Sequence, residues 1–388
     1  MEWIVTDDIR RETWRRLFEF ANIDLATDAI IARHGTPKDN SERQNYKKQA
    51  QQVRACVLQA KEYFDAAEAS TLITSPNHAY YGAICLASMM MLVLGDGRSA
   101  LDVLRRDSKN QHHGLQFSTG CNAKNAATGT VLIDETRVEI LENGHFANWY
   151  QALPRIEQIH VIHRRRQFSS EHRSFLPIGG YEIPSFRSLV GRKIKIIDLL
   201  RYFPDLSAEL YRARVDVSRS KVTHEVEINV PQGRQGHVWY VHGAATPAER
   251  EAVLAGFEIE ARCAEFMTCE VDESTLRAII RVTWNIREAV PIFRWPTPRD
   301  TMSRDTIYYA DNVETPEFVD MYLVAYQLSM VSRYFPDIWM SCIESQCKAA
   351  KLIESAVELL KKKLPILALS TVTPGGVTIS THLEPWRP

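Results

Sequence analysis

The chain has 388 residues, of which 45% are hydrophobic and 24% are charged, and its 47 basic and 48 acidic residues leave a net charge of -1. This length exceeds the usual size of one hydrophobic core, so two or three domains are expected. The composition is that of an ordinary globular protein and excludes collagen-like, low-complexity and wholly disordered chains. Because the charges balance, any nucleic acid must be attracted by a local basic patch.

The seven cysteines are dispersed along the chain and include no C-x-x-C pair. This pattern argues against a zinc knuckle and favours reduced thiols that act as small hydrophobic side chains. Charged residues follow shortly after Met1, with no basic start and apolar signal core. We therefore expect a cytoplasmic protein with no metal and no cofactor.

Helices are predicted throughout the first third of the chain. Residues 6–22 suggest an amphipathic opening helix, and a longer helix begins at Ser41. Its apolar residues recur at spacings of four and three, which predicts one face packed against another helix. The stretch 79–95 then contains no charge but is shorter than the roughly twenty apolar residues of a transmembrane helix. We expect it to be a buried bundle helix and expect no membrane association.

In the later parts of the chain the sequence pattern changes twice, from helix to strand and back to helix. Residues 130–141, 221–230 and 237–243 are rich in β-branched and aromatic residues and predict strands, with a β-α-β unit through a helix at 248–266 and a strand at 277–284. Helices return after Thr315, the predicted N-cap of the first of them, and Lys361 to Lys363 are expected to form a solvated helix end.

The fold class predicted from these patterns is α+β. A helical bundle at residues 1–120 is followed by a mixed central domain at 121–305, and a C-terminal helical segment at 306–388 packs back on the core.

Three short motifs follow one another in the first third of the chain. They are AKEYFDAAEA at 60–69, a proline turn with two tyrosines at 75–87 (SPNHAYYGAICLA), and HHGLQF at 112–117. This order resembles HEPN bundles, in which a helix with a tyrosine pair packs on a long helix and a polar loop presents a histidine. The resemblance implies that the N-terminal bundle is HEPN-like.

Further motifs are similar to those of the YaaC-like family of bacterial proteins, and together they span most of the chain. They lie at 142–146, 197–200, 204–206, 332–334 and Trp339. The chain is therefore identified, by resemblance, as a YaaC-like protein with a HEPN-like N-terminal domain.

The HEPN resemblance implies metal-independent RNA cleavage by an arginine and a histidine four to six residues apart, in a homodimer that joins two such motifs. Arg106 and His112 fit this pattern, His113 fits as well, and Asp107 follows the arginine directly. In this hypothesis Arg106 stabilises the phosphate, His112 or His113 is the general base, and Asp107 orients one of them. Position in the bundle selects Arg106, because spacing alone recurs by chance. The alternative is that these are ordinary polar loop residues.

A second basic segment follows the bundle, with aromatic residues interleaved. Arginines bind phosphate and aromatic rings stack on bases, so this is the expected RNA-contacting strip, although solvated surface arginines are more common. Its members are Arg155, Arg164, Arg165, Arg166, Arg173, Arg192 and Lys193. Arg333, at the end of a predicted helix, is expected to close a salt bridge between domains rather than to act in catalysis.

The function predicted from the sequence is RNA cleavage or RNA binding in the cytoplasm, in a toxin-like or antiphage system with a possible partner protein. That context follows from the resemblance alone. The alternative is a catalytically inert interaction module, in which the bundle dimerises or docks a partner enzyme. Digestion of RNA in EDTA discriminates between these hypotheses.

Overall fold

The computed structural model describes most of the chain. The described residues are 2–96, 100–167, 170–215, 219–227, 234–242, 266–272, 277–285, 292–293, 298–300, 307–310, 315–374 and 377–380. Side chains are described for residues 4, 6–96, 100–155, 183–215, 315–374 and 377. The helix predicted at 248–266 lies almost entirely outside the described residues.

The N-terminal part is a set of helices, as the sequence predicts. Asp8, Asn22 and Asp39 precede helices and accept hydrogen bonds from N–H groups of the first turn, which explains where these helices begin. The elements are α1 (Ile9–Leu17), η1 (Phe18–Ala21), α2 (Ile23–His34), α3 (Asn40–Ala69) and α4 (Ser75–Leu94).

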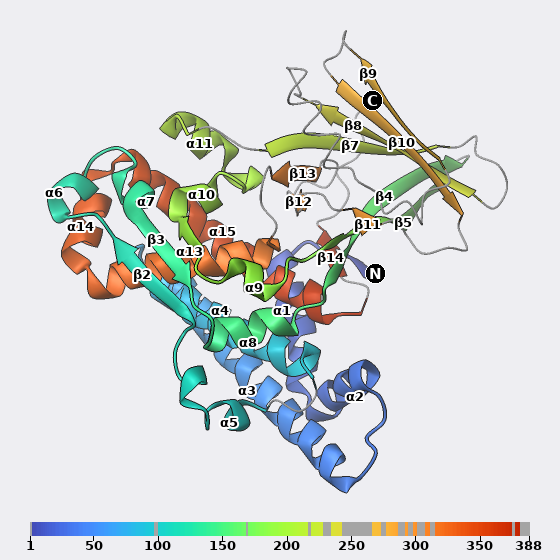
Figure 1. Ribbon diagram of the computed structural model, residues 1–388, viewed down its shortest axis with the longest axis horizontal. Helices are drawn as coiled ribbons and strands as arrows, with labels where there is room; N and C mark the ends of the chain where they lie inside the picture. Colours follow the sequence, from blue (N-terminus) through green and yellow to red (C-terminus); the bar gives the residue numbers. More distant parts are fainter. Residues whose placement is uncertain are drawn as a thin grey trace.

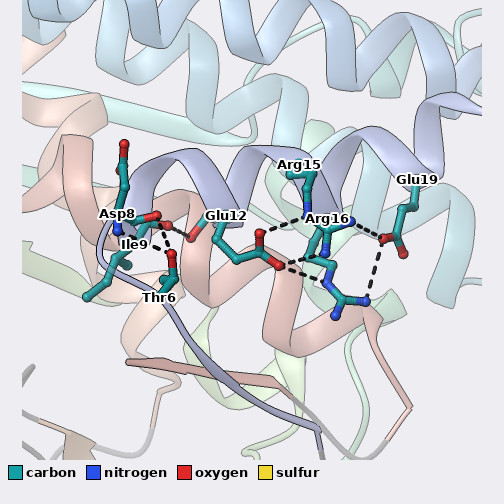
Figure 2. A network of polar contacts seen from close by, with 8 residues as sticks. Thr6, Asp8, Ile9, Glu12, Arg15, Arg16 and Glu19 are labelled. Carbon is teal, nitrogen blue, oxygen red and sulfur yellow. Dashed lines mark hydrogen bonds and ion pairs between the residues drawn. The ribbon is translucent and has the colours of Figure 1, made fainter. Parts of the chain in front are cut away.

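The outer face of α1 carries a network of exposed ion pairs (Figure 2). Glu12 accepts hydrogen bonds from Arg15 at 2.6 Å and from Arg16 at 3.2 Å, and Glu19 lies 3.4 Å from Arg15. Hydrogen bonds from Arg15 lower the pKa of Glu12. Such exposed pairs add little stability, but they neutralise the arginines of this face. This part of α1 is therefore a poor site for phosphate.

The long helices α3 and α4 are antiparallel and form the centre of the helical body (Figure 1). Gly82 makes their close approach possible, because a Cβ atom there would lie 2.6 Å from the ring of Phe64. At the adjacent position of each helix, Tyr63 stacks on Tyr81 with ring centroids 5.4 Å apart. These contacts fix which part of α3 faces which part of α4.

The uncharged sequence of α4 reflects its place in the core. By length and composition this helix could cross a membrane, but 72% of the apolar window is buried inside the fold. The prediction of a buried bundle helix is therefore confirmed.

The C-terminal helices pack back on the core, as predicted, and the first and last of the three lie against α4 (Figure 1). They are α13 (Glu317–Tyr334), α14 (Pro336–Ser345) and α15 (Lys348–Val372). The helix α13 begins two residues after Thr315, whose hydroxyl donates to Asp320 instead of capping the first turn. Helices from both ends of the chain thus share one hydrophobic core.

The expectation of a solvated lysine end is wrong, because α15 continues through Pro365 to Val372. Lys361 and Lys363 are buried in the middle of this helix. Lys363 donates to Glu317 at 2.6 Å and to Asp205 at 2.9 Å. These carboxylates compensate the cost of burying the ammonium group and raise its pKa despite that burial.

Between the two sets of helices lie short elements and a three-stranded antiparallel sheet in the order β2-β3-β6. The predicted strand at 130–141 is partly wrong, because Val131–Glu135 forms a helical turn that buries Leu132 and Ile133 before β3 begins. The elements of this part are α5 (Leu101–Leu104), η2 (Ser108–Asn110), β2 (Leu115–Thr119), α6 (Ala123–Ala126), α7 (Val131–Glu135), β3 (Thr136–Ile140), α8 (His145–Ala152), α9 (Phe186–Leu189), β6 (Lys193–Lys195), α10 (Ile196–Leu200), η3 (Pro204–Leu206) and α11 (Ser207–Ala213).

The remaining strands form three further sheets. Strands β7, β8 and β10 confirm predicted strands, but β8 and β10 are antiparallel neighbours, so the expected β-α-β unit, which needs parallel strands, is wrong. The strands are β1 (Glu2–Val5), β4 (Ile156–Gln167), β5 (Ser170–Glu182), β7 (Arg219–Glu227), β8 (Arg234–His242), β9 (Phe266–Asp272), β10 (Arg277–Asn285), β11 (Ile292–Phe293), β12 (Pro298–Asp300), β13 (Ile307–Ala310) and β14 (Val377–Ser380). The class is α+β, as predicted, with helices at both ends; the domain boundaries at 120 and 305 stay predictions.

Candidate functional site

The loop between α5 and η2 carries Arg106, the arginine selected from the sequence. The side chain of Arg106 is 76% exposed, and its Nη2 lies 3.7 Å from Oδ2 of Asp102. Asp102 also accepts from Lys48 at 2.6 Å and from Gln52 at 3.1 Å, both on α3. Hydrogen bonds from these partners lower the pKa of Asp102, with Lys48 contributing most. Arg106 therefore shares one carboxylate with a lysine at the surface.

The other residues of the predicted motif have local roles. Asp107 accepts the N–H of Lys109 at 2.9 Å and so caps η2. His112 is exposed, and its Nδ1 accepts the N–H of Gly114 at 3.0 Å. In the described part of this loop, the contacts of Asp107 do not reach His112 or His113.

Arg106 and His113 are anchored at different levels of the α3–α4 pair. Arg106 is held through Asp102 at Gln52, whereas Nδ1 of His113 lies 3.0 Å from the hydroxyl of Tyr80. The contacts between the two helices show which part of α3 faces Tyr80, and Gln52 lies about a dozen residues along α3 from that part. At the rise of an α-helix this separation corresponds to roughly 18 Å. The described structure thus brings His113 to α4 and leaves Arg106 near Asp102.

His113 begins a chain of hydrogen bonds that runs into the core. Tyr80 bonds to Tyr322 of α13 as well as to His113. Tyr322 lies 3.4 Å from Nδ1 of His145 on α8, and Nε2 of that ring lies 2.9 Å from the hydroxyl of Ser88. Each group has one hydrogen to donate when the histidines are neutral, so all four bonds can form in either direction. The chain can therefore switch the tautomer of His113 without leaving a buried group unpaired.

Burial keeps these groups uncharged. The side chain of His145 is partly buried, and this burial lowers its pKa to about 4. Burial also raises the pKa of Tyr80 and that of Tyr322. The pKa of half-buried His113 is lowered by burial first, then by the positive charge of Arg333 and then by His112. Its imidazole is therefore neutral near pH 7 and can accept a proton.

Arg333 reaches the same region from the last turn of α13. Its guanidinium donates to the hydroxyls of Tyr81 and Tyr334 and lies 5.4 Å and 4.7 Å from the centroids of their rings. The expected salt bridge is wrong for the described residues, because phenol groups, and no carboxylate, contact this guanidinium there. The half-buried charge of Arg333 thus faces oxygen donors and π-faces and is not neutralised by them.

The contact between α4 and α13 positions this arginine. Asn77, in the first turn of α4, accepts hydrogen bonds from Ser329 at 3.0 Å and from Ser332 at 2.9 Å. Tyr326 donates to the carbonyl of Leu115 at 3.0 Å and so holds α13 against the start of β2. The motifs SPNHAYY and SRY, which are far apart in the sequence, therefore meet in the fold. Only the tertiary contact reveals this.

The expected RNA-contacting strip is described in part. Arg155, Arg192 and Lys193 are exposed, and Lys193 lies 3.3 Å from Glu139. Arg192 donates to the carbonyl of Ser188 at 2.8 Å. These three residues are accessible, but part of their charge is already engaged.

The rest of this strip lies on β4 and β5. In that pair of strands the backbone of Arg164 is opposite Arg173, and Arg165 and Arg166 continue along β4. The side chains of these four arginines lie outside the described ones.

The family comparison covers nearly the whole helical body. The sequence profile described as YaaC-like Protein matches residues 21–372, which include α4, α13 and the loop that carries His113. No curated protein and no solved structure matches this chain. The match extends over far more than half of the sequence, and the chain belongs to the YaaC-like family.

Proposed function

We propose that this chain is an RNA-binding effector that cleaves RNA without a metal ion, and that Arg333 and His113 act on the phosphodiester. One observation supports this most: a half-buried guanidinium that phenol groups contact is close enough to a neutral imidazole for its charge to lower, after burial, the pKa of that ring. A guanidinium that is not paired with a carboxylate can bind phosphate through a bidentate pair of hydrogen bonds. An imidazole titrating near or below neutrality can take a proton from a ribose 2′-hydroxyl.

The chemistry assigns a role to each group. His113 accepts the 2′-hydroxyl proton, and the 2′-oxygen then attacks phosphorus while the bond to the 5′-oxygen breaks and that oxygen takes a proton from water. Arg333 stabilises the charge that grows on the phosphorus oxygens. Tyr80 holds the imidazole through Nδ1, so that Nε2 is directed to the substrate. The products are a 2′,3′-cyclic phosphate and a 5′-hydroxyl.

Aromatic side chains beside the guanidinium support the choice of RNA as substrate. Tyr63 and Tyr81 are already stacked and partly exposed, and Tyr334 is 57% exposed. Unpaired bases stack on such rings, and each stacked base contributes about 1–3 kcal/mol. Phosphate binding and base stacking can therefore occur together at one end of α13.

We also propose that the N-terminal helices form a HEPN-like bundle. In this proposal the chain acts in the cytoplasm as a homodimer formed through the bundle, in a toxin-like or antiphage system that can include a partner protein. The exposed guanidinium of Arg106 is then a further phosphate contact that a second copy could bring to the cleft.

Incubation of the purified protein with total RNA in EDTA tests the proposal. We expect fragments with 2′,3′-cyclic ends, which His113→Asn abolishes and which Arg212→Gln, a variant at a 76% exposed arginine on α11, leaves unchanged. Intact RNA with the wild-type protein contradicts cleavage. Retained RNA binding in that sample would reduce the proposal to an RNA-binding module, and loss of both would favour the inert interaction module.

A further inference from the structure

A pair of thiols lies at the turn between α14 and α15. The Sγ atoms of Cys342, near the end of α14, and Cys347, just before α15, are 3.6 Å apart. Both cysteines are free, and Gln346 between them adopts a left-handed conformation with φ of 49° that reverses the chain. We propose that Cys342 and Cys347 form a redox site that a hydroperoxide oxidises to a disulfide and a dithiol reduces again.

The two sulfur atoms differ in a way that suits this reaction. Cys347 is partly exposed and occupies the N-cap position of α15, a helix of 25 residues with no acidic residue in its first turn. Cys342 is fully buried, and burial raises the pKa of its thiol. Cys347 is therefore the sulfur that a peroxide reaches, and Cys342 is the sulfur held beside it.

The steps balance without a metal or cofactor. The thiolate of Cys347 attacks one oxygen of the hydroperoxide and the O–O bond breaks. The attacked oxygen stays on sulfur as a sulfenic acid, and the other oxygen leaves as water or an alcohol with the proton that the thiol released. The sulfur of Cys342 then attacks Sγ of Cys347, the new disulfide forms, and the sulfenic oxygen leaves as water with the thiol proton. Two electrons pass from the thiol pair to the peroxide, and a dithiol returns them by exchange.

The geometry needs a small movement. The Sγ atoms must approach by roughly 1.6 Å to reach the length of a disulfide bond, which rotation about the Cα–Cβ bonds can contribute. The thiol of Cys347 is held loosely, since its carbonyl contacts to Ala126 and Cys342 are both 3.8 Å long. A third thiol, Cys121, is nearby but donates to the carbonyl of Val131 at 3.5 Å. Of these three thiols, Cys342 and Cys347 are thus the two whose sulfur atoms are in direct contact.

Peptide mapping of the native full-length protein tests the site, because trypsin releases both cysteines in one peptide, 334–348. The protein is treated with equimolar hydrogen peroxide, its free thiols are alkylated, and the masses of the tryptic peptides are measured by mass spectrometry. We expect this peptide to carry no alkyl group and to be two hydrogen atoms lighter than the reduced, unalkylated peptide, and dithiothreitol to reverse the change. Peptides that contain Cys56 or Cys85 should stay alkylated.

Variants identify the order of the steps. In Cys342→Ala the sulfenic acid on Cys347 has no partner, so dimedone should label it about tenfold more than in the wild type. Cys342→Ser serves if the alanine variant does not fold, and Cys85→Ala is the matched control that should behave as the wild type does. Two alkylated thiols in peptide 334–348 after oxidation would overturn the proposal, as would a disulfide between Cys347 and Cys121.

Discussion

Two regions of the molecule combine an arginine with a histidine. In one region the two residues are close in sequence, in the other the fold brings them together, and the arginine is more exposed in the first region than in the second. In the loop after α5, Arg106 is 76% exposed and shares Asp102 with Lys48. At the contact of α4 with α13, Arg333 is half-buried among tyrosines and its charge lowers the pKa of His113. The first pair satisfies a sequence spacing, and the second is assembled by tertiary structure.

The difference matters because burial changes what a charge can do. Water and salt screen an exposed guanidinium, whereas a half-buried one acts through a lower effective dielectric. An imidazole beside a positive charge also remains a base at lower pH than a free one. Proximity in sequence identifies suitable residue types, but the surroundings decide which of them can act on a phosphate.

The largest expected effect is a difference in RNA-cleaving activity between variants of the two arginines. Arg333→Gln should lower kcat/KM on a short RNA oligonucleotide about 100-fold or more, equivalent to roughly 3 kcal/mol of transition-state stabilisation. Arg106→Gln should change it by only a few-fold, because its charge is already shared with Asp102. The reverse result would return the site to the loop predicted from sequence.

The next effect concerns the loop that presents His113. Gly144 has φ of 108°, and a Cβ atom there would lie 2.5 Å from the backbone of Gly114 and 2.7 Å from Nδ1 of His112. Gly144→Ala should therefore lower the free energy of unfolding by about 2–3 kcal/mol, from backbone strain and overpacking together. Urea unfolding measures the change.

Gly35→Ala is the matched control for this variant. Gly35 has a similar φ of 92° but nothing within 4 Å of the added atom, so its loss isolates the strain of the backbone. Equal losses for the two variants would show that the packing around Gly144 is looser than described.

The sequence predicted much of the fold because periodicity records burial. The buried stripe of α3, the core position of α4 and the return of helices after Thr315 all follow from the spacing of apolar residues. The class, the YaaC-like resemblance and three of the central strands were predicted correctly. Local pattern failed at Val131–Glu135, where two buried aliphatic residues on a helical turn resemble a strand.

The candidate site could be predicted only in its parts. The tyrosine pair, the histidine loop and Ser332–Tyr334 were each noticed, yet nothing in the sequence states that α13 packs on the first turns of α4. For the same reason Arg333 was assigned a salt bridge, although its neighbours proved to be Tyr81 and Tyr334. Long-range contacts between helices do not follow from spacing.

A smaller effect tests the buried chain of hydrogen bonds behind His113. The pKa of His145 falls from 6.5 to about 4 in the folded protein, so the unfolded chain binds more protons between these values. The stability that neutral His145 contributes is complete above pH 6.5 and is lost as pH falls toward 4, by about 1 kcal/mol per pH unit. Urea unfolding between pH 7 and pH 4 measures this slope.

Two variants decide whether His145 causes the slope. His145→Gln should reduce it, whereas His112→Gln, at an exposed ring, should leave it as in the wild type. An unchanged slope in His145→Gln would assign the pH dependence to other groups. The buried chain would then be a structural feature of the core with no proton of its own to release or bind.

The smallest expected effect belongs to Asp107, which the HEPN resemblance assigns to orienting a catalytic histidine. Its carboxylate instead caps the three-residue η2 through Lys109. Asp107→Ala should therefore lower the free energy of unfolding by only about 0.5 kcal/mol, the low end for the loss of a cap, and leave RNA cleavage unaltered. A loss of cleavage comparable to that of Arg333→Gln would show that the loop rearranges on binding RNA. The exposed pair of Arg106 and His112 would then become the catalytic one.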